Sequence, residues 1–172
     1  DRARPTRRGT AGAARDFRLA GERAHRLRLR QQAANATAFQ VLLGTFAIWL
    51  GRWCDQEDFA IGVPVNDRPS LAFEDLVGLF VNTVAWRADL SGEPDFPTVI
   101  RRVRLSAPAL LAQRGVPFER VVEALNPPRE PGRDPVFQVM FALQEPAESA
   151  VPVLPGAHVT EWRLPPDTTH FD

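Results

Sequence analysis

Few side chains in this sequence have the chemistry for acid–base or nucleophilic catalysis. There are three histidines, His25, His158 and His170, and one cysteine, Cys54. We interpret none of the histidines as an oriented general base: we expect His25 to lie on the surface, and Cys54 to be a small buried core residue. The sequence also lacks a phosphate-binding glycine loop, a G-x-S-x-G turn and paired histidines or cysteines at metal-ligand spacing. No complete active site is recognisable in the chain.

One amide stands out in the segment GLFVNTVAWR, residues 78–87. Side chains of a strand point alternately to opposite faces, so Asn82 shares its face with Phe80, Val84 and Trp86. An amide among such neighbours costs about 1–3 kcal/mol unless it is hydrogen-bonded. We therefore expect Asn82 to be largely buried and bonded to backbone groups of a neighbouring strand or loop.

The elements that must position this amide follow from the pattern of apolar residues. Strands are predicted at 14–19, 58–65, 79–90, 136–144 and 157–164, and helices at 20–34, after Thr37, from Asp95 and from Pro117. Thr37 and Gln40 predict a capping box. Six apolar residues at helical spacing predict the buried face of that helix: Phe39, Leu42, Leu43, Phe46, Trp49 and Leu50. We expect Pro108 to kink or break the following helix. Strands mixed with helices predict an α/β sandwich in which helices cover a mixed sheet.

Composition excludes several classes of function. All 21 basic residues are arginine and 21 acidic residues balance them, so nothing in the net charge favours nucleic acid or a membrane surface. The basic excess of residues 1–30 is interpreted as a solvated linker followed by an arginine-rich helix face, and a nucleic-acid-binding arm is the alternative. A single cysteine is typical of a reducing cytoplasm, and the apolar run from Ala38 to Leu50 is shorter than the roughly 20 residues that span a bilayer. The opening residues do not resemble a secretory signal.

Four linked motifs suggest a family. GLFVNTVAWR resembles the G-x-F-V-N-T-x-x-x-R signature of condensation domains in nonribosomal peptide synthetases, members of the CoA-dependent acyltransferase-like superfamily. Upstream, GRWCDQEDFAIGVPVNDR (51–68) is similar to the same family. Downstream, VPFERVVEAL (116–125) resembles its P-F-E-x-x-V-E-x-L segment, and 129–141 resembles R-D-x-S-R-N-P-x-F-Q-V-x-F. The resemblance covers nearly the whole chain in the family's order.

The sequence also departs from the family pattern. The H-H-x-x-x-D-G motif, whose second histidine is the family's catalytic residue, is absent. It belongs to the N-terminal lobe, so residues 14–172 resemble the C-terminal lobe, incomplete at its C-terminal end, after a linker at 1–13. Gln113–Gly115 replace a His-Gln-Asp-like run, and Arg129–Pro135 vary the proline-rich motif.

The resemblance implies one lobe of a two-lobed chloramphenicol-acetyltransferase-like fold. A tunnel between the lobes would admit an acyl or peptidyl donor and an aminoacyl acceptor, each on the phosphopantetheine arm of a carrier domain, and an amide bond would form there. This chain would supply tunnel wall but no catalytic residue, and it would bind no cofactor or metal directly. The tunnel-lining or supporting residues implied are Asn66, Arg68, Asn82, Arg87 and Arg133.

Expected partners are the two carrier domains and the N-terminal lobe, without nucleic acid or membrane. Structural explanations remain open for each site residue: a satisfied buried amide for Asn82, a polar turn for Asn66, and a solvent-facing or ion-paired role for Arg133. Two other functions also remain open: a non-catalytic lobe that binds a carrier or another partner, and a lobe of a related epimerisation or ester-forming acyltransferase.

Overall fold

Two antiparallel strands form the centre of the structure, a computed structural model that describes residues 9, 11–68, 70–144 and 156–159. β1 (Asp58–Asn66) and β2 (Val81–Asp89) pair along their whole length, with Val63 opposite Val84. One face of this pair is apolar and buried, and it is formed by Ile61, Val63, Val65, Val84, Trp86 and Ala88. This face forms one half of the hydrophobic core.

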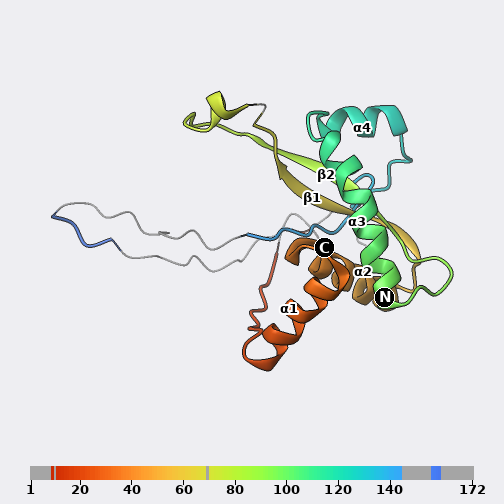
Figure 1. The fold of residues 1–172 in the computed structure, drawn as a ribbon. Coiled ribbons are helices and arrows are strands. Elements are labelled where there is room, and N and C mark those ends of the chain that lie inside the picture. Colours follow the sequence, from red (N-terminus) through yellow and green to blue (C-terminus); the bar gives the residue numbers. More distant parts are fainter. Residues whose placement is uncertain (1–8, 10, 69, 145–155, 160–172) are drawn as a thin grey trace.

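Helices lie against the strand pair (Figure 1) and supply the other half of the core. The helices in the described residues are α1 (Glu22–Ala34), α2 (Ala38–Cys54), α3 (Phe96–Ala112) and α4 (Phe118–Leu125). Of these, α2 and α3 contain the buried residues. The predicted capping box starts α2: the Thr37 hydroxyl accepts from the Gln40 N–H at 3.2 Å, and the Gln40 side chain accepts from the Thr37 N–H at 2.9 Å. The Asp95 carboxylate caps α3 through the Thr98 N–H at 3.0 Å. Sequence and structure thus agree on where the two core helices begin.

The predicted face of α2 packs on the core: Leu43 is buried and Phe39, Phe46 and Leu50 pack against the core cluster. The most buried residues of α2 are Val41, Leu43, Gly44, Ala47 and Gly51, whereas Trp49 is 55% exposed. A Cβ atom on Gly44 would lie 2.6 Å from Cδ1 of Ile100 on α3. Small residues at the helix crossing therefore let α2 and α3 approach closely, and this close approach selects which side of α2 faces the core.

The predicted strand at 136–144 is reduced to a single bridge. Met140 pairs in parallel with Gly62 of β1, through bonds from Gly62 N–H to Val139 C=O (2.9 Å) and from Phe141 N–H to Gly62 C=O (2.8 Å). Phe141 also packs on Phe39 and Phe46 of α2 at ring distances of 5.7 and 5.5 Å. This segment lies beside β1 as a third strand would, but it makes one isolated parallel bridge, so the sheet in the described part of the chain is the antiparallel pair of β1 and β2 and not the predicted mixed sheet.

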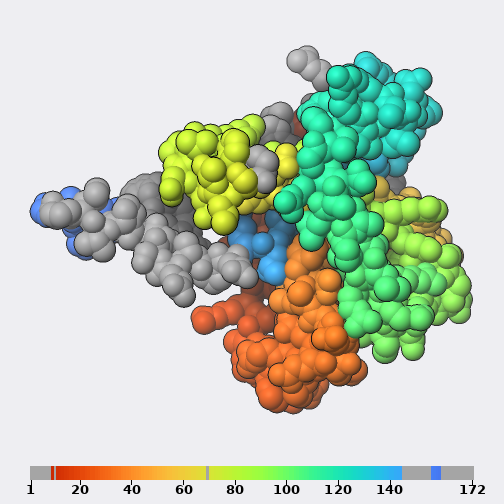
Figure 2. Space-filling view, turned by 45° about the horizontal axis from the view of Figure 1, so that its top comes forward, coloured from red at the N-terminus to blue at the C-terminus, as the bar shows by residue number. Residues whose placement is uncertain are grey.

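The loop between β1 and β2, of which the structure describes residues 67–68 and 70–80, projects from the body of the molecule (Figures 1 and 2). We call it the arm. It contains a short 3-10 turn at Leu71–Phe73 and is closed at its base by a bond from Asp67 N–H to Phe80 C=O, 2.8 Å. Several of its exposed side chains are apolar: Leu71, Val77 and Leu79 are 81%, 105% and 90% exposed. The carboxylates of Glu74 and Asp75 are exposed beside them.

Three further predictions are corrected or left open. Residues 14–19 are exposed and form no strand. Pro108 does not break α3; it is exposed, so solvent can satisfy the carbonyl that its ring leaves unbonded. Of the predicted strand at 157–164, residues 157–159 are irregular and the rest lie outside the described residues.

No single helix in the described part of the chain is both long and apolar enough to cross a bilayer, and only α1 and α2 taken together, bent by 104°, meet those limits of length and composition.

Candidate functional site

Asn82 lies on the buried face of β2, opposite Val65, and its side chain is half-buried. Its Nδ2 donates to the carbonyls of Arg114 and Val116, each at 2.6 Å, and its Oδ1 accepts from the Thr83 N–H at 2.8 Å. The expected backbone partners are therefore present, although the side chain is less buried than predicted. The amide fixes the turn between α3 and α4 to β2.

Two aromatic rings continue this connection from α4 to β1. Phe118, the first residue of α4, packs against Phe137 at 4.9 Å between ring centroids. The Phe137 ring lies directly over Gly62, where an added Cβ would come within 2.5–2.9 Å of three ring carbons. Four segments that are distant in sequence, around residues 62, 82, 116 and 137, thus form one contiguous cluster.

Gly62 and Phe137 are members of this cluster that the sequence did not single out. A glycine inside a strand is a recognised signal of close approach by another group. Gly62 within FAIGVPV carried that signal, but the pattern alone does not tell which residue would approach it.

Asn66 and Arg68 lie at the base of the arm. The Asn66 side chain accepts from the Arg68 N–H at 3.2 Å, which forms an Asx turn. The Arg68 guanidinium donates to the carbonyls of Phe73 and Leu76, the latter at 3.0 Å, and it lies 4.2 Å from the centre of the Phe80 ring. The polar turn predicted for Asn66 is therefore present, and Arg68 contacts the arm itself.

Arg87 and Arg133 are both engaged in ion pairs. Arg87 binds both carboxylate oxygens of Asp58 across the strand pair, at 2.8 and 2.6 Å. This hydrogen bond is the main reason that the pKa of Asp58 is lowered and the pKa of Arg87 is raised. Arg133 donates to Glu130 at 3.1 Å and to Gln138 at 3.3 Å, which agrees with the ion-paired alternative.

The possible catalytic side chains do not gather into a site. His25 and His158 are exposed, and His170 lies outside the described residues. Cys54 is exposed at the end of α2, next to the exposed Trp53, so the prediction that it is buried was wrong. The described part of the chain holds no group of three or more His, Cys, Asp or Glu side chains placed to bind a metal.

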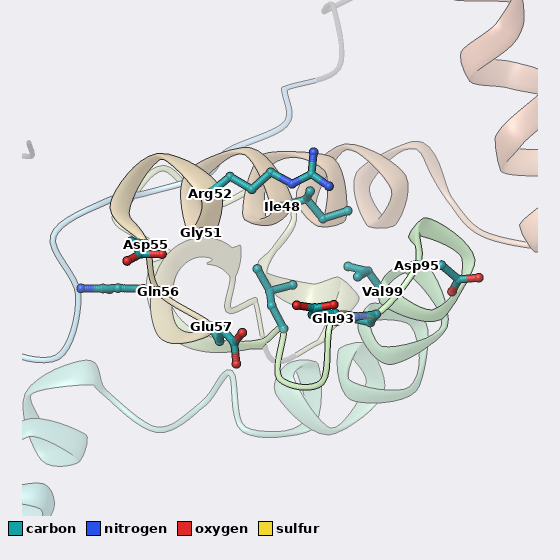
Figure 3. Close-up of a pocket in the computed structure, with 11 residues that line it drawn as sticks. Ile48, Gly51, Arg52, Asp55, Gln56, Glu57, Glu93, Asp95 and Val99 are labelled. Carbon is teal, nitrogen blue, oxygen red and sulfur yellow. The ribbon is translucent and has the colours of Figure 1, made fainter.

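A cavity of about 560 Å³ lies between the end of α2 and the start of α3 (Figure 3). Its wall carries the carboxylates of Asp55, Glu57, Glu93 and Asp95 together with Arg52. The Thr98 bonds of the Asp95 cap lower the pKa of that carboxyl. The cavity does not include any predicted site residue, and its charged groups are exposed.

Comparison with known proteins identifies the family. The model of the family described as "Condensation domain" matches residues 1–155. The chain belongs to the condensation domain family. Malpibaldin synthetase of Mortierella alpina is 37% identical over 172 residues, which is 100% of this chain and 3% of that protein. The condensation-domain chain thus spans a small part of this much longer relative.

Solved condensation-type structures have the same fold. A four-domain nonribosomal peptide synthetase bound to AMP and glycine superimposes with a TM-score of 0.81 at 24% identity, over 86% of this chain and 11% of that one. The X-domain of teicoplanin biosynthesis, solved in complex with OxyB, gives a TM-score of 0.74 at 30% identity, over 96% of this chain and 36% of that one. The condensation-domain chain therefore has helices packed on an antiparallel strand pair, in the predicted acyltransferase-like fold.

Proposed function

We propose that the chain is the C-terminal lobe of a condensation domain in a nonribosomal peptide synthetase and forms one wall of its reaction tunnel. The observation that carries this proposal is the convergence of the family's motif segments on Asn82 and Phe137. The Asn82 side chain binds the carbonyls of Arg114 and Val116, and Phe137 contacts Phe118. Residues from different motifs that hold one another in place favour a role in one common tunnel wall. They do not favour a separate binding site at each motif.

The reaction proposed for the complete domain joins two carrier-bound substrates. The amine of the aminoacyl acceptor attacks the thioester carbon of the donor; the C–N bond forms, the C–S bond breaks, the donor carrier's thiol leaves, and the amine loses a proton. The phosphopantetheine arms belong to the carriers and enter with the substrates. A wall of this kind contributes by holding the two reacting groups in line.

The chain's own residues act in this proposal as supports. Asn82 fixes the turn before α4, and Arg87 and Arg133 are neutralised by Asp58 and Glu130. No described histidine lies among them. The general base would therefore come from the H-H-x-x-x-D-G motif of the N-terminal lobe.

The arm is the proposed contact with that lobe. Leu71, Val77 and Leu79 expose nearly all of their apolar surface to solvent, and exposed apolar groups of this kind mark surfaces that another structure covers. We assign the N-terminal lobe as the structure that covers them, because it is the part of the same domain that would face a projecting loop across the tunnel.

Reconstitution with loaded carriers tests the function. The complete condensation domain that contains this chain is mixed with an aminoacyl donor carrier and an aminoacyl acceptor carrier, and mass spectrometry follows the acceptor. We expect dipeptide on the acceptor carrier with the complete domain and none above the uncatalysed rate with the chain alone. Product from the chain alone would contradict the two-lobe mechanism.

A non-catalytic, partner-binding lobe is the second candidate. It is favoured by the likeness to the X-domain that was solved in complex with OxyB. A complete domain that forms no dipeptide, yet binds another protein of its assembly in a pull-down with purified components, would support this candidate over condensation.

A further inference from the structure

The arm has an ordered shape with little hydrophobic burial to stabilise it. Of its described residues, only Asp67, Arg68, Phe73 and Phe80 are half-buried, and the others are exposed. Ordering a loop costs about 1–2 kcal/mol of backbone entropy for each residue. The two half-buried rings meet edge to face at 6.1 Å, which is a small apolar contact for a loop of this length. Polar contacts must therefore contribute much of its order.

Arg68 makes those contacts from one side chain. Its guanidinium donates to the carbonyl of Phe73, at the end of the 3-10 turn, and to that of Leu76, further along the loop. The same group lies over the Phe80 ring, at the point where the chain returns to β2. Arg68 thus connects the start, the middle and the end of the arm.

The geometry requires a guanidinium. Two separate N–H groups reach two different carbonyls while the planar face packs on an aromatic ring. A lysine ammonium has comparable charge, but it is a compact head that cannot bond both carbonyls and stack at the same time. Replacing Arg68 by lysine should therefore retain the positive charge but lose at least one of the two carbonyl bonds or the packing on the Phe80 ring.

We infer that Arg68 is a positioning residue that preforms the arm and so fixes the places of Leu71, Val77 and Leu79 on the surface. The effect of Arg68 on catalysis rests on the proposed function, and its effect on the order of the arm does not. Arg68 acts within the arm, because both carbonyls and the ring that it contacts belong to residues 67–80. It does not need to contact either substrate.

Hydrogen exchange of the chain alone tests the positioning role without requiring catalysis. We expect Arg68→Ala to speed exchange of the amides at 70–80 by about tenfold, because opening the arm then breaks fewer bonds. Exchange in the paired part of β1 and β2 should change much less. Arg68→Lys should lie between Arg68→Ala and the native chain, and Arg26→Ala, which removes an exposed pair with Glu22 on α1, should leave the arm unchanged.

Chemical rescue distinguishes positioning from general loss of stability. Added ethylguanidinium should restore slow exchange to the arm of Arg68→Ala, and it should do nothing for Arg26→Ala. Unchanged arm exchange in Arg68→Ala, or exchange that rises equally throughout the chain, would overturn the inference.

The same variants in the complete domain separate the two proposals. If the native domain forms dipeptide, Arg68→Ala should slow product formation and ethylguanidinium should restore it; a loss that ethylguanidinium does not restore would count against positioning. If the native domain forms no dipeptide while the arm still responds to Arg68→Ala and to rescue, the proposed function fails and the positioning role of Arg68 stands.

Discussion

At the scale of single residues, Asn82 illustrates how a strand residue can control a distant turn. Its two N–H groups are both used, each on a different carbonyl of the α3–α4 turn, and its oxygen is used on the next backbone N–H. A primary amide is the side chain that offers two donors and an acceptor without a charge. The chemistry of asparagine, and not only its size, therefore fits this position.

Substitution of Asn82 tests this requirement. Asn82→Leu should destabilise the chain by about 1–3 kcal/mol, because the carbonyls of residues 114 and 116 lose their donor. Asn82→Asp should be at least as damaging at neutral pH, since a carboxylate would face two carbonyl oxygens, and acid should reduce its loss by restoring one donor. Urea unfolding measures both changes.

The matched control is Gln32→Leu, which replaces an exposed amide on α1 and should alter stability by less than about 0.5 kcal/mol. An Asn82→Leu chain with the native urea midpoint would show that these bonds contribute nothing to stability.

At the scale of elements, the approach of residues 137–141 to β1 depends on the absence of a side chain at Gly62. The Phe137 ring occupies the space that a Cβ would need, and it is itself 4% exposed. A buried aromatic ring cannot move aside without disturbing its neighbours. The β1 sequence therefore determines whether this segment can bind to the sheet.

Gly62→Ala should destabilise the chain by about 1–3 kcal/mol through overpacking. The double variant Gly62→Ala, Phe137→Leu should lose less than the sum of its two single variants, because the smaller side chain relieves the clash. Gly115→Ala is the control, since an added Cβ there would meet only the Asp67 carboxylate at 3.8 Å. Additive losses in the double variant would contradict the proposed clash.

The ion pair at the end of the strand pair makes stability depend on pH. Arg87 lowers the pKa of Asp58 below its ordinary value of 3.8, so the folded chain binds this proton less readily than the unfolded chain. The pair therefore stabilises the fold above about pH 4 and loses that contribution as pH falls through the lower folded value.

Arg87→Gln should be less stable than the native chain at pH 7, by a small amount because both partners are exposed. The difference should shrink at high salt and disappear near pH 2, where Asp58 is protonated in both states. Thermal unfolding at the two pH values measures it. A difference that persists undiminished in acid would assign the effect to packing of the Arg87 stem.

The sequence predicted the starts of α2 and α3 correctly, because each start depends on a hydrogen bond between residues close together in the chain. The cap at Thr37 and the cap at Asp95 use side chains within three residues of the bond they make, so their signals are local. For α2 the apolar spacing predicted the core-facing residues Phe39, Leu43, Phe46 and Leu50 but missed Gly44, whose burial depends on its close approach to Ile100 of another helix. The sequence predicted that Asn82 would bond to backbone groups. It did not predict which residues would supply them, because the turn at 114–116 is more than 30 positions away along the chain.

At the scale of the whole molecule, the arm gives the chain an apolar surface far from its core. Because this surface is formed without the N-terminal lobe, it is available to a second copy of the chain. Self-association of the isolated chain should therefore depend on the arm.

The triple variant Leu71→Ser, Val77→Ser, Leu79→Ser should weaken self-association by roughly tenfold or more, since it removes most of the exposed apolar area of the arm. The control pair Leu105→Ser and Leu125→Ser changes exposed leucines of α3 and α4 and should have little effect. Sedimentation equilibrium measures both. Equal weakening by the two sets would mean that association is not centred on the arm.

The single bridge between Gly62 and Met140 also has a kinetic meaning. β1, β2 and α3 follow one another in the chain, so their contacts close short loops, whereas the bridge joins positions roughly 80 residues apart and closes a loop of higher entropic cost. We expect the strand pair and α3 to form in the folding transition state and the 137–141 segment to dock afterwards. Gly62→Ala should then speed unfolding and leave the rate of folding nearly unchanged. The segment that completes the motif cluster would be the last part of the fold to assemble.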